Sequence, residues 1–133
     1  MSSNKQEIKA EDFKPEYIGR GVWHSWQLTG FRAKTRSEVV IIYAFILMYV
    51  VNMICKNCQH HAKLYISNTG YIEDILNSKE KDLTDSEIIE QFNIWLYEFH
   101  KSANLFSGKS SPSYDEVSEF YLNLKVCTEN CGN

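Results

Sequence analysis

Two cysteines, Cys55 and Cys58, stand three positions apart near the middle of the sequence. A Cys-x-x-Cys pair can cycle between a dithiol and a disulfide when one sulfur is held as a thiolate. The same spacing can also supply two of the four ligands of a zinc ion. A second pair, Cys127 and Cys131, lies near the end of the sequence. The cysteines therefore indicate either thiol redox chemistry or a zinc site.

Two histidines that follow the first pair bear on this choice. A zinc site would require four thiolates or imidazoles to converge as a tetrahedron. His60 and His61 follow Cys58 too closely to act as an ordinary second ligand pair. Zinc modules are also usually poor in core residues, because the metal stabilises the fold, whereas apolar residues form 44% of this sequence. We therefore favour a redox pair, and a non-enzymatic zinc-binding interaction module that uses the four cysteines is the alternative.

The cysteine pair follows a long apolar run, from residue 39 to residue 54. This run is shorter than the roughly 20 residues that a membrane-spanning helix needs, so no membrane span is expected. It predicts a helix that is buried nearly all round, with Ser37 as its cap. The next helix is expected to start near Cys55 and to run to Ser67. Its amino terminus would favour negative charge and so would lower the pKa of a thiol in the first turn.

Three further helices are predicted around these two. The first covers residues 16 to about 33, where Gly30 and two other glycines weaken the helical pattern and indicate that something packs close to the backbone. Capping boxes at residues 84–87 and 113–116 predict the starts of the last two helices. The sequence therefore predicts an all-α protein: a four-helix bundle plus a short fifth helix, with the Cys-x-x-Cys pair at the start of the third helix.

The composition fits one globular domain. A chain of 133 residues, 14% of them aromatic, can bury a core without covalent staples. The net charge of -3 and the lack of a basic stripe give no electrostatic basis for binding nucleic acid. No secretory signal is visible, so a cytoplasmic protein is expected. We divide the chain into a flexible tail (1–14), a helical bundle (15–126) and a second tail that carries the other cysteine pair (127–133).

Three segments resemble the motifs of a known enzyme family. Gly19–Gln27 resembles a Gly-Arg-x-x-Trp-x-x-x-His motif, Cys55–Ala62 a Cys-x-x-Cys-x-x-His motif, and Phe92–Lys109 a Trp-x4-His-x-x-x-Asn-x4-Lys motif. These motifs, in this order, are typical of the Erv/ALR family of FAD-dependent sulfhydryl oxidases, and the resemblance covers about residues 17–121. The short chain and its Cys-x-x-Cys-Gln-His-His string are most similar to virus-encoded members. Such an origin would place the protein in the host-cell cytoplasm or the virion.

The resemblance implies a flavoprotein that makes disulfide bonds. A helical bundle would hold FAD with the cysteine pair beside the isoalloxazine, and residues 15–126 would form this FAD-binding unit. Cys58 would donate electrons into the flavin, and Cys55 would exchange with the thiols of client proteins. Oxygen would accept the electrons and give hydrogen peroxide. We also expect a homodimer that forms through the apolar second helix and its neighbours.

The same resemblance assigns nine further residues to FAD binding. They are Gly19, Arg20, Trp23, Gln27, His61, Trp95, His100, Asn104 and Lys109. Trp23 and Trp95 would stack on the flavin or form a wall beside it. His100 and Asn104 are four residues apart, so they share one helix face and would both reach the adenosine end.

The phosphates of FAD would need side-chain partners. The sequence has no Gly-x-Gly-x-x-Gly loop that could hold them with backbone groups. Arg20 and Lys109 would therefore meet the pyrophosphate as point charges. Gln27 stands where the family has a histidine, and its amide can form hydrogen bonds but cannot be protonated.

The second cysteine pair has two interpretations. Cys127 and Cys131 resemble the mobile shuttle pairs of the family, which accept electrons from client thiols and pass them to the central pair. Alternatively, they form a local disulfide that ties down the tail, or are two idle thiols. The sequence leaves these interpretations open.

Overall fold

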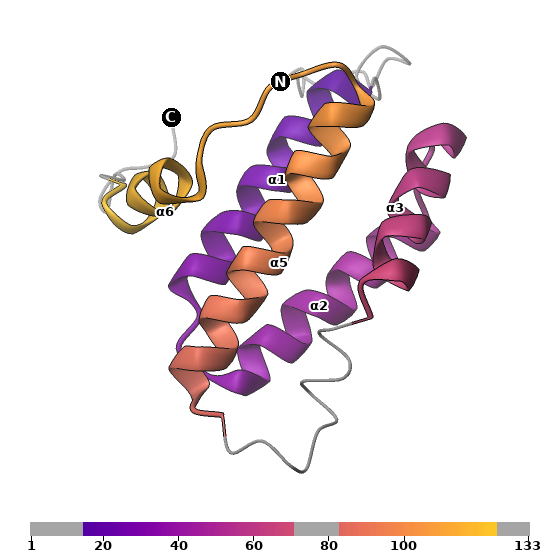
Figure 1. Ribbon diagram of the computed structural model, residues 1–133. Coiled ribbons are helices and arrows are strands. Elements are labelled where there is room, and N and C mark those ends of the chain that lie inside the picture. Colours follow the sequence, from indigo (N-terminus) through magenta and orange to yellow (C-terminus); the bar gives the residue numbers. More distant parts are fainter. Residues whose placement is uncertain (1–14, 71–82, 125–133) are drawn as a thin grey trace, which may run out of the picture.

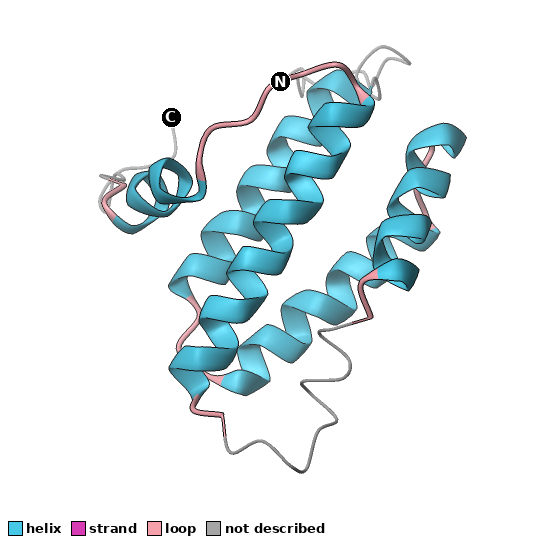
Figure 2. Cartoon of the chain, viewed as in Figure 1, coloured by secondary structure: helices cyan, strands magenta, loops and turns pink. Residues whose placement is uncertain are grey.

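The computed structural model describes residues 15–70 and 83–124, and this part of the chain is all-helical, with no strand (Figures 1 and 2). Its helices are α1 (Pro15–Arg32), α2 (Arg36–Val51), α3 (Lys56–Asn68), α5 (Asp85–Phe106) and α6 (Tyr114–Leu122). The predicted all-α fold is confirmed, and so is the position of the cysteine pair at the start of the third helix. The two predicted tails, and with them Cys127 and Cys131, lie outside the described residues.

Four of the helices, α1, α2, α3 and α5, surround a common core. α1 and α5 run side by side, and α2 and α3 both contact α5. In Figure 1, α6 lies on the side of the α1–α5 pair that is away from α3. Ile46 of α2 and Phe92, Leu96 and Phe99 of α5 are fully buried at the centre of the core. A smaller apolar cluster that includes Tyr121 attaches α6 to the bundle.

Local sequence sets the starts of the last two helices. The side-chain oxygen of Thr84 accepts a hydrogen bond from the backbone N–H of Glu87 at 3.2 Å, and α5 begins there. Ser113 accepts from the backbone N–H of Glu116 at the same distance, and α6 begins there. Each bond satisfies a donor that a helix end would otherwise leave unpaired. Both predicted helix starts are confirmed.

The predicted cap of α2 is wrong by two residues. Thr35, and not Ser37, is the N-cap residue, because its hydroxyl accepts from the backbone N–H of Glu38 at 3.3 Å. The Glu38 carboxylate in turn accepts from the backbone N–H of Thr35 at 3.2 Å. This reciprocal pair forms a complete capping box, which Ser37 could not form because no acidic residue follows it by three positions.

The prediction that α2 is buried nearly all round is also wrong. One side of the helix, including Ile42, Ile46 and Val50, faces the core. The other side carries five large exposed apolar side chains, Val40 (43% exposed), Ile41 (67%), Phe45 (56%), Met48 (57%) and Val51 (65%). α2 meets the other helices of the bundle along one side, so its uniformly apolar sequence leaves an apolar stripe on the surface. None of the described helices combines the length and the apolarity that crossing a membrane requires.

The close approach that the glycines of α1 indicate occurs at Gly30. A Cβ atom there would lie within 2.4 Å of Asn93 Oδ1 and 3.3 Å from a ring carbon of Phe92. Asn93 is buried on α5, and its Nδ2 donates to the carbonyl of Gly30 at 3.1 Å. Gly19 and Gly21 have no such neighbours within 4 Å. Gly30 therefore lets α1 and α5 approach closely enough for this bond.

Candidate functional site

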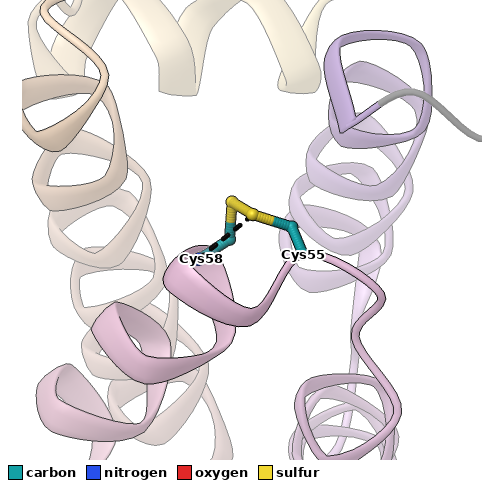
Figure 3. The surroundings of a disulfide bond; sticks show 2 residues. All are labelled: Cys55 and Cys58. Carbon is teal, nitrogen blue, oxygen red and sulfur yellow. Dashed lines mark hydrogen bonds between the residues drawn. A yellow bond between two sulfur atoms is a disulfide. The ribbon is translucent and has the colours of Figure 1, made fainter.

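Cys55 and Cys58 form a disulfide at the amino terminus of α3 (Figure 3). Their Cα atoms are 5.3 Å apart. Cys55 is the N-cap residue of the helix, and its Sγ accepts a hydrogen bond from the backbone N–H of Cys58 at 3.2 Å. The N–H groups and the dipole of a helix amino terminus stabilise negative charge. Reduction of this pair would therefore produce a thiolate in a favourable position.

The disulfide forms part of the wall of a cavity of about 650 Å³. Side chains from α1, the end of α2, the start of α3 and the second half of α5 line this cavity. Its volume lies within the roughly 300–1,000 Å³ of sites for small molecules and cofactors. Eight of the nine residues that the sequence motifs assign to FAD line it together with the two cysteines: Gly19, Arg20, Trp23, Gln27, His61, His100, Asn104 and Lys109.

Trp95, the ninth residue, is not part of the cavity wall. It is buried in the core, where its ring meets Tyr43 edge-on at a centroid distance of 5.4 Å. Its indole N–H donates to the hydroxyl of Thr69 at 3.0 Å, and its carbonyl accepts from the hydroxyl of Tyr65 at 3.1 Å. Trp95 therefore fastens the end of α3 to α5.

His100 and Trp23 form a stacked pair in the cavity wall. Their ring centroids are 4.4 Å apart and their planes differ by 9°. Burial lowers the pKa of His100 from 6.5 to about 4, with smaller contributions from His24 and Lys109. His100 is therefore a neutral ring at pH 7.

The stability of the protein should depend on pH through His100. Between about pH 6.5 and pH 4 the unfolded chain binds a proton that the folded protein does not, so the free energy of unfolding falls as the pH is lowered through this window. Because the ring is partly exposed, we expect about 1–2 kcal/mol of loss. Urea unfolding of the wild type and of His100→Gln at several pH values measures this, and the variant should have the flatter profile. Equal slopes would show that another group is responsible.

His61 lies on α3 and faces the last turns of α5. Its Nε2 is 3.0 Å from the hydroxyl of Ser102, and its ring stacks on Phe106 at a centroid distance of 4.6 Å. These contacts fix the imidazole at the cavity wall, close to the turn that carries the cysteines. No metal is required to hold it there.

Gln27 connects the cavity to α6. The side chain is 3% exposed, and its Oε1 accepts from the hydroxyl of Tyr121 at 3.2 Å. The same hydroxyl lies 2.6 Å from Nδ1 of His24. The Tyr121 hydroxyl has one hydrogen, and it donates this hydrogen to Gln27 Oε1. In the bond with His24, Nδ1 is therefore the donor and the hydroxyl oxygen is the acceptor. Gln27 Nε2 has no partner in the described part of the chain, so an acceptor atom on a ligand would satisfy it.

Two cations belong to the outer part of the cavity. Arg20 and Lys109 are both exposed and both line it, so an anionic group at this position would meet positive charge from α1 and from the segment after α5. Asn104 fixes the position of that segment through two hydrogen bonds. Its side-chain Nδ2 donates to the hydroxyl of Ser111 at 2.9 Å, and its backbone carbonyl accepts from the backbone N–H of Lys109 at 2.7 Å. Asn104 thus lines the cavity and also positions Lys109.

Several cavity residues have no role in the sequence motifs. Phe99, Ala103 and Phe106 line the cavity along one side of α5. Their spacing of four and three residues predicts one apolar side of a helix, and it does not distinguish a cavity wall from a core. Tyr49 and Ile54 come from the corner between α2 and α3. The sequence contains no periodic pattern that would identify these two residues, because the path of the chain between α2 and α3 brings them to the cavity.

In residues 15–70 and 83–124, no three His, Cys, Asp or Glu side chains come together as metal ligands. Cys55 and Cys58 are joined to each other instead. A zinc site would therefore have to recruit residues from outside this part of the chain.

Comparisons with protein-family models, curated proteins and solved structures found no match to this chain. Its function has to be inferred from its own residues and their geometry. A disulfide at a helix amino terminus and a cavity with aromatic walls and a cationic outer part are the features that such an inference must explain.

Proposed function

We propose that this protein is an FAD-linked sulfhydryl oxidase that introduces disulfide bonds into client proteins and passes the electrons to oxygen, producing hydrogen peroxide. One observation supports this most strongly. The disulfide lies in the wall of the same cavity as eight of the nine residues that the Erv/ALR resemblance assigns to FAD. A virus-encoded origin, and a place in the host-cell cytoplasm or the virion, belong to the same proposal.

The cavity suits a ligand that has a flat ring system at one end and phosphates at the other. Trp23, Trp26 and Phe99 supply aromatic surface, on which planar rings pack well. Arg20 and Lys109 supply the charge for a diphosphate. The unpartnered Nε2 of Gln27 supplies a hydrogen-bond donor. Bound FAD would accept two electrons from the cysteine dithiol and transfer them to oxygen.

The two cysteines divide the thiol chemistry between them. A client thiolate attacks Sγ of Cys55, forms a mixed disulfide and releases Cys58 as a thiolate. A second client thiolate then attacks the client sulfur of that mixed disulfide and releases Cys55. The client gains a disulfide, and the protein is left as a dithiol. The amino terminus of α3 favours negative charge on both sulfurs, because Cys55 Sγ accepts from the backbone N–H of Cys58 and Cys58 lies in the first turn.

A second copy of this chain is the proposed partner of the apolar side of α2. Ile41, Phe45, Met48 and Val51 form one stripe there, at intervals of three or four residues. Apolar surface buried between two copies contributes about 25 cal/mol per Å². The stripe carries no charged residue, so it can face its own symmetry mate without repulsion.

Phe45→Glu tests this homodimer. A carboxylate in an apolar interface is costly to desolvate, so the variant should weaken the dimer about 100-fold or more, a loss of about 3 kcal/mol. Sedimentation equilibrium measures the change. Leu122→Glu is the matched control, because it places the same charge at an exposed apolar residue of α6. A wild type that is monomeric at micromolar concentration would contradict the proposal.

The visible spectrum of the purified protein tests the oxidase proposal itself. The protein should be yellow, and its flavin absorption should bleach when dithiothreitol is added without oxygen and return when air is admitted. A colourless protein with stoichiometric zinc would instead identify the zinc-binding module. A colourless, metal-free protein whose disulfide still cycles would identify a disulfide carrier that another oxidase recharges.

A further inference from the structure

Gln59 joins the end of α2 to the start of α3. Its side-chain Nε2 donates to the carbonyl oxygens of both Val50 and Val51, each at 2.9 Å. Its backbone N–H donates to the carbonyl of Cys55, also at 2.9 Å. The residue is buried and directly follows Cys58. The backbone and the side chain of this one residue thus link the cysteine turn to the helix that precedes it.

The two carbonyl groups that Gln59 contacts have an electrostatic effect. The last carbonyls of a helix lack partners within the helix and carry the negative end of its dipole. Val50 lines the same cavity as Cys55 and Cys58, so the negative end of α2 and the amino terminus of α3 meet at this corner. The Val50 carbonyl also accepts from the backbone N–H of Met53 at 3.3 Å, so the Gln59 amide compensates part of this negative charge. Without that part, the remaining negative charge near the cysteines would raise the free energy of a thiolate.

We infer that Gln59 is a positioning residue that sets the reduction equilibrium of the Cys55–Cys58 disulfide. It holds the cysteine turn against the cavity, and its amide offsets the carbonyl dipoles of α2. The second effect favours the dithiol, because it stabilises the thiolate. The inference gives the proposed oxidase a poised disulfide and in that sense rests on the proposed function, but the equilibrium itself is measurable whatever accepts the electrons.

The test measures the equilibrium constant for reduction of the protein disulfide by glutathione. In this reaction two glutathione thiols reduce the protein disulfide to the dithiol and form one glutathione disulfide. Gln59→Met keeps the length of the side chain and removes both donors. The full-length chain, with Cys127 and Cys131 changed to serine, leaves one disulfide to measure. The equilibrium constant for reduction should fall about 10-fold, which corresponds to a potential lower by ~30 mV. The alkylation rate of the reduced pair should also shift to higher pH, because its thiolate is less stable.

Asn93→Leu is the matched control. Asn93 is another buried amide that donates to a carbonyl near the end of a helix, but that carbonyl belongs to Gly30 of α1, which, unlike Val50, does not line the cavity. Its replacement should lower the unfolding midpoint and change the glutathione equilibrium less than 2-fold. If Gln59→Met does not fold, Gln59→Glu has the same length, and its carboxylate should shift the equilibrium in the same direction and further.

Two results would overturn the inference. One is an equilibrium constant for the Gln59 variant equal to that of the wild type, and the other is an equal shift in Asn93→Leu, which would reduce Gln59 to a general stabilising role. The oxidase proposal fails by a different result, a protein that binds no flavin. Because the glutathione equilibrium needs no flavin, the two failures are distinguishable.

Discussion

Cys58→Ser should abolish thiol-driven oxygen consumption while FAD remains bound. Serine cannot form the disulfide or supply a thiolate, so the dithiol that donates electrons is lost. The hydroxyl is close in size to the thiol, and Cys58 lies at the start of α3 and not in the core, so the cavity should keep its shape. An oxygen electrode and the visible spectrum measure the two properties on the same sample.

Asn57→Ser is the matched control for this variant. It places the same side chain one residue earlier in α3, at an exposed position, and should leave oxygen consumption unchanged. Turnover by Cys58→Ser at the wild-type rate would remove Cys58 from the electron path. Loss of both flavin and activity would instead show that Cys58 supports the cavity itself.

Gly30→Ala should destabilise the protein by about 2–4 kcal/mol. The new methyl group would lie 2.4 Å from Asn93 Oδ1 and would force the amide away from the Gly30 carbonyl. Overpacking costs about 1–3 kcal/mol, and a broken buried hydrogen bond costs a similar amount. The higher helix propensity of alanine recovers only about 1 kcal/mol. Urea unfolding followed by circular dichroism measures the sum.

Gly21→Ala should change the free energy of unfolding in the opposite direction. Gly21 lies in the same helix, is exposed, and has no neighbour within 4 Å of an added Cβ. Only the propensity gain remains, so this variant should be more stable by up to about 1 kcal/mol. Equal effects of the two substitutions would show that the contact between Gly30 and Asn93 does not limit the approach of α1 and α5.

The elements that the sequence predicted well are those whose signals are local. The sequence patterns that begin with Thr84 and Ser113 each span four residues, and each N-cap side chain accepts a backbone N–H from within its own pattern, so they determine their helix starts without help from the rest of the fold. Residues Thr35 to Glu38 have the same pattern, and they form the N-terminal cap of α2. The Cys-x-x-Cys turn is similarly local, because Cys55 caps the helix that carries Cys58.

The misplaced residue of the site has a geometric explanation. His100 and Asn104 are four positions apart on α5 and both line the cavity. Trp95 lies one turn before Phe99 on the same side of α5, and its ring packs against Tyr43 and Phe92 in the core. The motif specified the residue types, whereas the position along α5 determined which of them reach the cavity.

Other parts of the site depend on how the helices pack. The hydrogen bonds of Tyr121 with His24 and Gln27 join residues more than ninety positions apart. Tyr49 and Ile54 enter the cavity because of the path between α2 and α3. The exposure of Phe45 depends on which side of α2 the other helices cover. No pattern in the sequence records these relations, since each is set by the relative positions of two or more elements.

Attachment of α3 at both ends has a consequence for repeated turnover. Gln59 secures its first turn to the end of α2, and Thr69 and Tyr65 secure its last turns to Trp95. Making and breaking the sulfur–sulfur bond then requires only local rotation of two short side chains, with the helix axis stationary. The proposed oxidase would therefore spend little time on reorganisation in each cycle, and the arrival of client thiols or of oxygen would limit its rate.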